Sequence, residues 1–246
     1  MSLPANVLSR VFWRSLFLQA SWNPRGMQNV GFAYAMAPAL AALYSDRGQR
    51  AKAALRHLEF FNCHPYLAAA ILGGAVRLEE RVARGEAPPE SVSAFKRALG
   101  PPFAALGDGF FWLALRPAAA LAAAITAPHI GAWSILVFLV LYNAVHLAGR
   151  VWLFRIGYSS GEAVVDEVAR AHLAAGTGLL KSAGAIFAGC IAARAVLVAD
   201  LPARHVHAVV VGCLILVFTA LLPRLGAARA VYIALVLGLA LGGGFL

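Results

Sequence analysis

The stretch from His57 to Gly74, HLEFFNCHPYLAAAILGG, decides the fold. It starts with polar side chains and then becomes a run of Ala, Ile and Leu. The apolar part, 66–76, is too short to cross a bilayer, because a spanning helix needs about 20 apolar residues. Irregular backbone at membrane depth is tolerated only where it lines a wet cavity or is buried in protein. We therefore predict that this segment enters a membrane without crossing it and presents Asn62 and its neighbours to a cavity.

The composition of the whole chain indicates a membrane protein. Of its 246 residues, 61% are hydrophobic and only 13% are charged, and the mean hydropathy is +0.74. Soluble domains carry about 25% charged residues, so this chain has too little charge to cover a water-exposed surface. The net charge of +10 comes from Lys and Arg at the ends of apolar runs. That placement favours contact with anionic lipid headgroups over nucleic-acid binding, which would need a basic stripe.

The pattern along the chain predicts an all-α fold in one membrane domain, 1–246. Residues 6–20 alternate at helical spacing between apolar side chains and Arg10 or Arg14, which predicts an amphipathic helix in the membrane interface. Residues 77–100 are hydrophilic and predict an aqueous helix–loop–helix. Residues 101–246 are mainly apolar, so we expect a polytopic integral membrane protein with broken or re-entrant helices. The expected spanning segments are 130–148, which Arg150 and Arg155 should end, and then about 183–199, 206–222 and 228–246.

A second stretch repeats the pattern of the first. It is Gly107–Asp108–Gly109–Phe110–Phe111–Trp112, and it ends at Arg116–Pro117. We expect the glycines and the proline to break a helix here. An Asp in the middle of a spanning segment costs about 2.5–3.5 kcal/mol on insertion scales, so something must compensate for Asp108. A polar cavity with a hydrogen-bonding ligand would do so, and a structural ion pair with an arginine of another helix is the alternative.

A sugar suits such a cavity because its hydroxyls both donate and accept hydrogen bonds. Asn offers both functions, and Asp and Glu accept strongly. The nearby aromatic side chains could pack on the apolar face of a sugar ring, although such residues are also ordinary packing residues. His64 before Pro65 could equally cap a turn, and His57 is expected at the interface. No catalytic triad, phosphate loop or metal motif occurs, so we predict no cofactor and no metal. The cysteines Cys63, Cys190 and Cys213 lie far apart and suggest neither a metal site nor a disulfide.

Four stretches together resemble a known family. They are RSLFLQASWNPRGMQNVGFAYAMAPAL (14–40), HLEFFNCHPYLAAAILGGAVRLEE (57–80), GPPFAALGDGFFWLALRP (100–117) and GYSSG (157–161). In this order they resemble the IID subunit of the mannose/fructose/sorbose family of the bacterial phosphotransferase system. The resemblance implies a multi-pass protein of the bacterial cytoplasmic (inner) membrane that binds and moves a hexose together with a IIC subunit. It further implies that a separate cytoplasmic IIB subunit, supplied by IIA, phosphorylates the sugar.

The resemblance also implies residue roles. Asn62 corresponds to the Asn of the family's Phe-Phe-Asn motif and is the leading sugar contact. Gly107, Asp108, Arg116 and Pro117 match the family's Gly-Asp and Arg-Pro motifs. Where family members often have Thr-Gln before the proline, this chain has Cys63–His64 before Pro65. The expected hexose contacts are Asn62, Glu59, Asp108 and His64, with Gln28 and Asn29 as weaker candidates.

Two classes of function remain at this point. The first is a transport subunit in a higher oligomer of the IIC–IID pair, in contact with lipid, with no phosphoryl-carrying or catalytic residue of its own. The second is a non-transporting regulatory or scaffold membrane protein that keeps the same fold. The short C-terminal region favours the second class, and the motifs around Asn62 and Asp108 favour the first.

Overall fold

The computed structural model describes residues 2–198, with side chains described up to residue 191. Within this range the chain is almost entirely helical and contains no strand, only two isolated bridges at Asn23–Met27 and Met27–Phe61. The elements are α1 (Ala5–Ser15), α2 (Asn29–Leu43), α3 (Arg47–His57), α4 (Ala68–Ala83), α5 (Glu90–Gly107), the π-helix η1 (Asp108–Leu115), α6 (Arg116–Ile130), η2 (Gly131–Trp133), α7 (Ser134–Ser160), η3 (Gly161–Ala163), α8 (Val164–Arg170) and α9 (Leu173–Val198).

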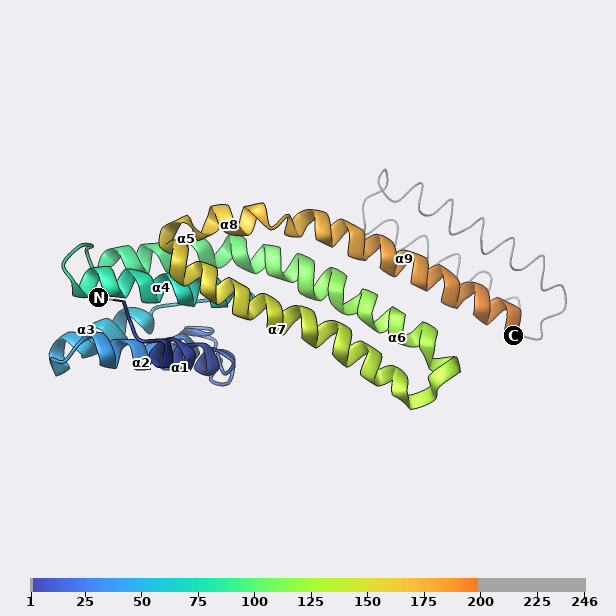
Figure 1. Cartoon of the computed structure of the whole chain (residues 1–246), viewed down its shortest axis with the longest axis horizontal. Helices are drawn as coiled ribbons and strands as arrows, with labels where there is room; N and C mark the ends of the chain where they lie inside the picture. The colour runs from blue at the N-terminus through green and yellow to red at the C-terminus, as the bar shows by residue number, and fades with distance from the viewer. Residues whose placement is uncertain (1, 199–246) are drawn as a thin grey trace. The chain divides into compact units, whose positions relative to one another are not determined.

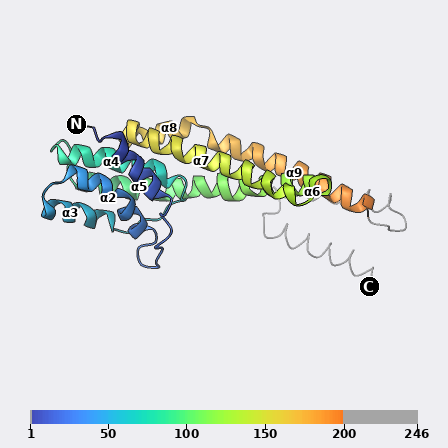
Figure 2. The same ribbon diagram turned by 60° about the horizontal axis from the view of Figure 1, so that its bottom comes forward.

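The chain divides into two compact units, Met1–Phe187 and Ala188–Leu246. The expected spanning segments 206–222 and 228–246 lie outside the described residues, and 183–199 lies inside them except for its last residue. Within the first unit, α4 packs against the C-terminal part of α7, and α1, α2 and α3 lie near that end of α7 (Figure 1). The antiparallel pair α6 and α7 extends away from this group, as a second view also shows (Figure 2).

Small residues allow α4 and α7 to pack closely. A side chain at Gly73 would collide with the backbone of Phe154, and one at Gly157 would collide with the backbone of Ala70. Close backbone approach through small residues is the usual way in which membrane helices associate. The contact therefore depends on glycine at both positions and fixes α7 against the short apolar helix.

The N-terminal helix is shorter than the sequence pattern predicts. It ends at Ser15, and residues 16–20 form turns instead of the last helical turn. These turns bury Leu18. Its backbone carbonyl lies so close to Gly31 of α2 that a side chain at position 31 would collide with it, so glycine is needed there. Trp13 and Phe17 are left exposed on the outer side, at 61% and 59%.

The predicted helix break at Asp108 is wrong. The chain stays helical from Glu90 through Ile130, passing Pro101, Pro102 and Pro117, and it widens to a π-helix over Asp108–Leu115. A π-turn absorbs an extra residue without ending the helix and often occurs at functional sites. In contrast, the segment between α3 and α4 is irregular, as expected, and it connects two helices instead of lying within one.

Helix α7 continues beyond the residues that should have ended it. Arg150 and Arg155 lie within a helix of 27 residues that reaches Ser160. The helical stretch Glu90–Ile191 contains an 18-residue window with mean hydropathy 1.9, of which 0% is buried. By length and composition this stretch can cross a membrane.

A buried acidic cluster, which we call the Glu79 cluster, ties α2, α3 and α4 together. Glu79 accepts hydrogen bonds from Arg56 Nε at 2.6 Å and from the Tyr44 hydroxyl at 2.6 Å, and His57 Nε2 lies 2.9 Å from its Oε1. His57 is therefore buried in the cluster and not at an interface. Burial would raise the pKa of Glu79, but the hydrogen bonds from His57 and Arg56 outweigh it and hold that pKa at about 2.

Candidate functional site

A small polar cavity lies between the irregular segment before α4, the loop before α2 and the π-helix. Its volume is about 210 Å³, and we call it the Asn62–Asp108 cavity. The lining residues come from three separate parts of the sequence: Gln19, Trp22, Gln28, Asn62, Cys63, His64, Ala104, Asp108 and Trp112.

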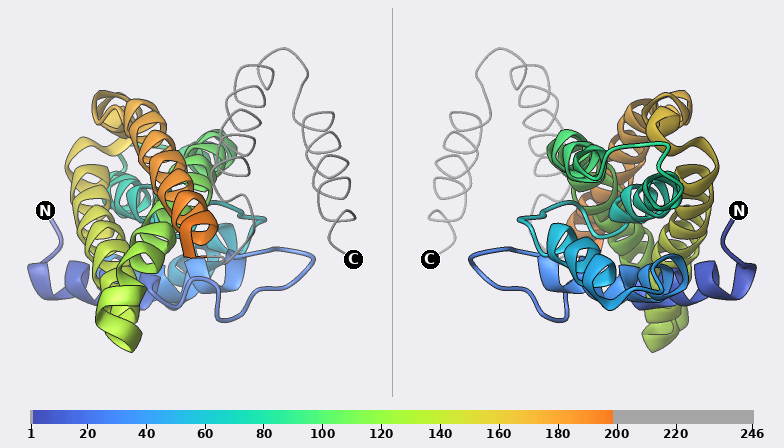
Figure 3. Two further views of the ribbon diagram at one scale, coloured as in Figure 1. Left: turned by 90° about the vertical axis from the view of Figure 1, so that its right-hand side faces the viewer. Right: turned by 90° about the vertical axis from the view of Figure 1, so that its left-hand side faces the viewer.

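Backbone pairing between two loops holds Asn62 in place. The amide of Gln28 donates to the carbonyl of Phe61 at 2.9 Å, and the amide of Phe61 donates to the carbonyl of Gly26 at 3.3 Å. Met27 adopts a left-handed conformation with φ 58°, which turns the chain into this pairing. The connection between α1 and α2 is seen as a loop at the side of the helices (Figure 3).

The Gln28 side chain is used to position the irregular segment. Its Nε2 donates to the carbonyl of Cys63 at 2.8 Å, and its Oε1 accepts from the amide of Cys63 at 3.0 Å. Gln28 is only 2% exposed. Since both ends of its amide are engaged with backbone, Gln28 shapes the cavity wall and has limited capacity for a ligand.

His64 is buried against the π-helix. Its ring stacks on Phe111 with centroids 5.2 Å apart and meets the edge of Trp112 at 4.8 Å. A side chain at Gly107 would overlap the His64 ring, so this glycine is required for the close approach. Among the described residues, His64 Nε2 has no hydrogen-bond partner, although it is a buried polar atom. Such an atom is costly unless a ligand or water satisfies it.

Asn62 and Asp108 share the cavity, and their side chains have no partner within residues 2–191. Asn62 is exposed and Asp108 is partly buried. The Asp108 carboxylate forms no ion pair within these residues, so the alternative of a structural pair with an arginine finds no support there. Both side chains are therefore available to a molecule in the cavity.

Two candidate residues lie elsewhere. Glu59 points to the surface and pairs with Arg97 at 3.4 Å. Asn29 supports the local backbone, because its Nδ2 donates to the carbonyl of Leu58 at 2.7 Å. The motif residues Pro65, Arg116 and Pro117 also do not line this cavity, and the first two border a neighbouring one.

Two further cavities and a groove are lined in part by residues that the sequence pattern did not single out. A cavity of about 390 Å³ shares Asn62 with the first and is also lined by Lys96. Lys96 is 2% exposed and lies over the Phe32 ring. The sequence signal for this burial was weak, because Lys96 lies in the segment 77–100 that is expected to be aqueous and, of its two neighbours in the chain, only Phe95 is apolar and large.

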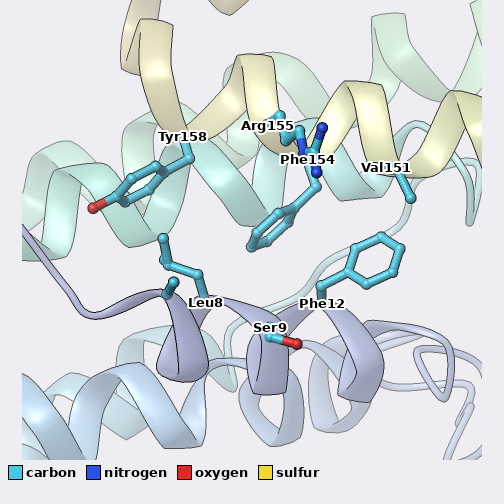
Figure 4. Close-up of a pocket in the computed structure, with 8 residues that line it drawn as sticks. Leu8, Ser9, Phe12, Val151, Phe154, Arg155 and Tyr158 are labelled. Atoms are coloured by element: carbon cyan, nitrogen blue, oxygen red, sulfur yellow. The ribbon is translucent and has the colours of Figure 1, made fainter.

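A second neighbouring cavity, of about 450 Å³, is lined by Arg116, Tyr142, His146 and Arg150 among others. An apolar groove of about 420 Å³ lies between α1 and α7, where Leu8 and Phe12 face Phe154 and Tyr158 (Figure 4). This groove contains none of the candidate residues. Arg150 carried a sequence signal too, since it stands in an apolar run without a nearby acid.

Apolar helices around small polar cavities define this chain as a helical membrane protein. The family model for the "PTS system mannose/fructose/sorbose family IID component" matches residues 2–240. The chain belongs to this family.

Individual relatives agree with that assignment. The mannose-specific EIID component of Escherichia coli K12 is 40% identical over 160 residues, which are 64% of this chain and 56% of the relative. The fructose permease IID component of Bacillus subtilis is 35% identical over 160 residues, covering 65% and 58%. The matched region thus spans little more than half the length of these relatives. Two solved structures are similar, each at 36% identity and covering 78% of this chain and 71% of the other. They are the mannose transporter ManYZ with microcin E492, at TM-score 0.62, and a structure described as a membrane protein, at 0.71.

Proposed function

We propose that this chain is the IID membrane subunit of a mannose-type phosphotransferase permease and that it binds a hexose in the Asn62–Asp108 cavity. The observation that carries the proposal is that two polar side chains without a hydrogen-bond partner in the described residues line one cavity, in a chain of this family. Asn62 can donate and accept, and Asp108 accepts, which matches sugar hydroxyls. The rings of Trp22 and Trp112 offer apolar faces for the sugar ring.

We further propose how the chain lies in the membrane. The exposed Trp13 of α1 and Phe17 of the turn after it support a position of α1 in the membrane interface, where aromatic side chains are favoured. The pair α6 and α7, with many exposed apolar side chains, crosses the bilayer in a multi-pass protein of the bacterial inner membrane. The irregular segment before α4 forms a re-entrant element whose backbone is tolerated because it lines a cavity.

The partners follow from the family. A IIC subunit completes the hexose site, and the two subunits translocate the sugar together, in a higher oligomer of the pair. Cytoplasmic IIA and IIB subunits supply the phosphoryl group. The similarity to the structure described as the mannose transporter ManYZ supports a membrane partner of this kind.

Hexose uptake in a strain without its own mannose-type permease tests the proposal. The chain is expressed with its IIC, IIB and IIA partners, and Asn62→Ala is expected to abolish uptake while membrane insertion stays normal. Asn6→Ala, which changes an exposed asparagine of α1, is the matched control and should keep wild-type uptake. Normal uptake by Asn62→Ala would remove Asn62 from the site. Absence of hexose uptake by the wild-type set, with the IIC subunit inserted and the IIA and IIB subunits expressed, would favour the regulatory or scaffold function.

A further inference from the structure

Arg150 is a buried cation without an acidic partner. It is 6% exposed, and one guanidinium nitrogen, Nη2, donates to the carbonyl of Ser15 at 2.9 Å. Its Nε is buried and has no hydrogen-bond partner within the described residues. None of the ion pairs in that part of the chain involves Arg150 or Arg116. A buried, uncompensated charge is costly, so an anion from outside this unit is expected to complete the site.

The cavity beside Arg150 is built for an anion with more than one charge. Its volume is about 450 Å³, and both Arg150 and Arg116 line it. His146 and Tyr142 add polar groups to the wall, and His146 Nδ1 is another buried atom without a partner among the described residues. A phosphate monoester carries about 1.5 to 2 negative charges at pH 7 and can therefore compensate two guanidinium groups. A carboxylate brings only a single charge.

The position of this cavity indicates what the phosphate is attached to. Gln19 and Trp112 line both this cavity and the Asn62–Asp108 cavity, so the two lie side by side. One cavity suits hydroxyl groups and the other suits a phosphate. A ligand with a polyol end and a phosphate end can occupy both.

We propose that the cavity of Arg116 and Arg150 holds the phosphoryl group of a phosphorylated hexose whose sugar ring lies in the Asn62–Asp108 cavity. This inference rests on the proposed function, since it assigns the reaction product to the same subunit. The product then competes directly with incoming hexose for the polyol cavity. Phosphorylated sugar would therefore slow further uptake when it accumulates.

Binding to the purified IIC–IID pair tests this, measured by calorimetry with mannose, mannose 6-phosphate and orthophosphate in parallel. Mannose 6-phosphate is expected to bind about tenfold more tightly than mannose, the factor that corresponds to about 1.4 kcal/mol. It should also displace mannose, and orthophosphate should weaken the binding of mannose 6-phosphate by competition. A fourth arm uses phosphatidylglycerol vesicles, because a lipid headgroup offers the same chemistry.

Three variants assign the effect to residues. Arg116 is exposed and has no internal bond among the described residues, so Arg116→Gln should fold and should remove most of the tenfold advantage without changing mannose binding. Arg150→Lys keeps the charge but loses the fork geometry and should show a partial loss. Arg155 is an exposed arginine of α7, like Arg150 a residue of that helix, but it lines the apolar groove. Arg155→Gln should therefore change the affinity for neither mannose nor mannose 6-phosphate.

The outcomes separate the two claims. If mannose binds but mannose 6-phosphate binds no better, or if Arg116→Gln leaves the ratio unchanged, the inference is overturned and the proposed function stands. If only the phosphatidylglycerol vesicles bind at Arg116 and Arg150, the site is a lipid site and the inference is likewise overturned. If neither sugar binds the wild-type pair, both claims are wrong.

Discussion

The Glu79 cluster and the cavities around Asp108 and Arg150 differ in where their partners come from. In the Glu79 cluster, Arg56, His57 and Tyr44 surround the carboxylate, so its charge is compensated by the chain itself. Asp108 has no ion pair within residues 2–191, and Arg150 has none either. A satisfied polar group contributes to stability, whereas an unsatisfied one is available to a ligand. The two regions should therefore respond in opposite ways to mutation.

The largest effect is expected at Glu79. Glu79→Ala leaves Arg56 and His57 without their acceptor and should lower the free energy of unfolding by about 3–5 kcal/mol, as for other broken buried ion pairs. Chemical unfolding of the purified IIC–IID pair in detergent measures this. Glu167→Ala, which removes a surface i,i+3 pair with Arg170, is the control and should cost less than about 1 kcal/mol. Equal losses for the two variants would contradict the distinction between the regions.

The pH dependence of stability follows from the same cluster. Glu79 has a folded pKa of about 2, below its ordinary 4.5, so its contribution is complete above pH 4.5 and is lost as pH falls toward 2. The difference corresponds to about 3 kcal/mol. Burial lowers the pKa of His57 below 6.5 despite its bond to Glu79. The unfolded state therefore binds a proton on His57 more readily than the folded state, and the free energy of unfolding already begins to fall below pH 6.5.

The free energy of unfolding of the wild type and of Glu79→Gln, each measured between pH 7 and pH 3, checks this prediction. The variant should keep the part of the acid loss due to His57 and lose the steeper part below pH 4.5. An identical pH profile for both proteins would show that Glu79 does not carry the acid sensitivity.

At Asp108 we expect a smaller change in the free energy of unfolding but a large change in hexose uptake. Asp108→Ala removes an acceptor that no described residue uses, so stability should change by less than about 0.5 kcal/mol. Loss of one charged hydrogen bond of about 1.5 kcal/mol to the sugar should lower uptake at least about tenfold. Asp166→Ala, at an exposed position of α8, is the matched control and should leave uptake unchanged. A strong destabilisation by Asp108→Ala would mean that the carboxylate is structural.

The smallest effect is expected at Glu59. Its pair with Arg97 is exposed on both sides, and such pairs are worth about 0–1 kcal/mol. Glu59→Gln should therefore keep stability and keep uptake within about twofold of wild type. A tenfold loss of uptake would place Glu59 at the sugar in the assembled permease.

Part of this site was predictable from local sequence. The unusual position of Asn62 and Asp108 beside apolar runs indicated a shared cavity, and both residues line one. The role of Gln28 was less accessible, because its two bonds to Cys63 depend on pairing between residues 35 positions apart. The helix break at Asp108 was wrongly predicted because glycine and proline lower helix propensity, while a π-turn can absorb them in a packed helix.

Other parts could not be read from local pattern. Lys96 looked like a residue of a solvated helix, yet the fold buries it over Phe32. Arg150 was interpreted as the end of an apolar segment, yet α7 continues past it and the side chain of Arg150 is buried. Burial of a single long side chain depends on neighbours from distant segments, which for Arg150 are Ser15 at the end of α1 and Tyr66 in the segment before α4. The sequence spacing of one helix does not contain that information.

A structure of the IIC–IID pair with bound hexose, determined by cryo-electron microscopy, tests the central claim most directly. Our account predicts sugar density in hydrogen-bond contact with the side chains of both Asn62 and Asp108. Sugar bound out of reach of both residues, with side chains of the partner subunit filling the cavity between them, would contradict it.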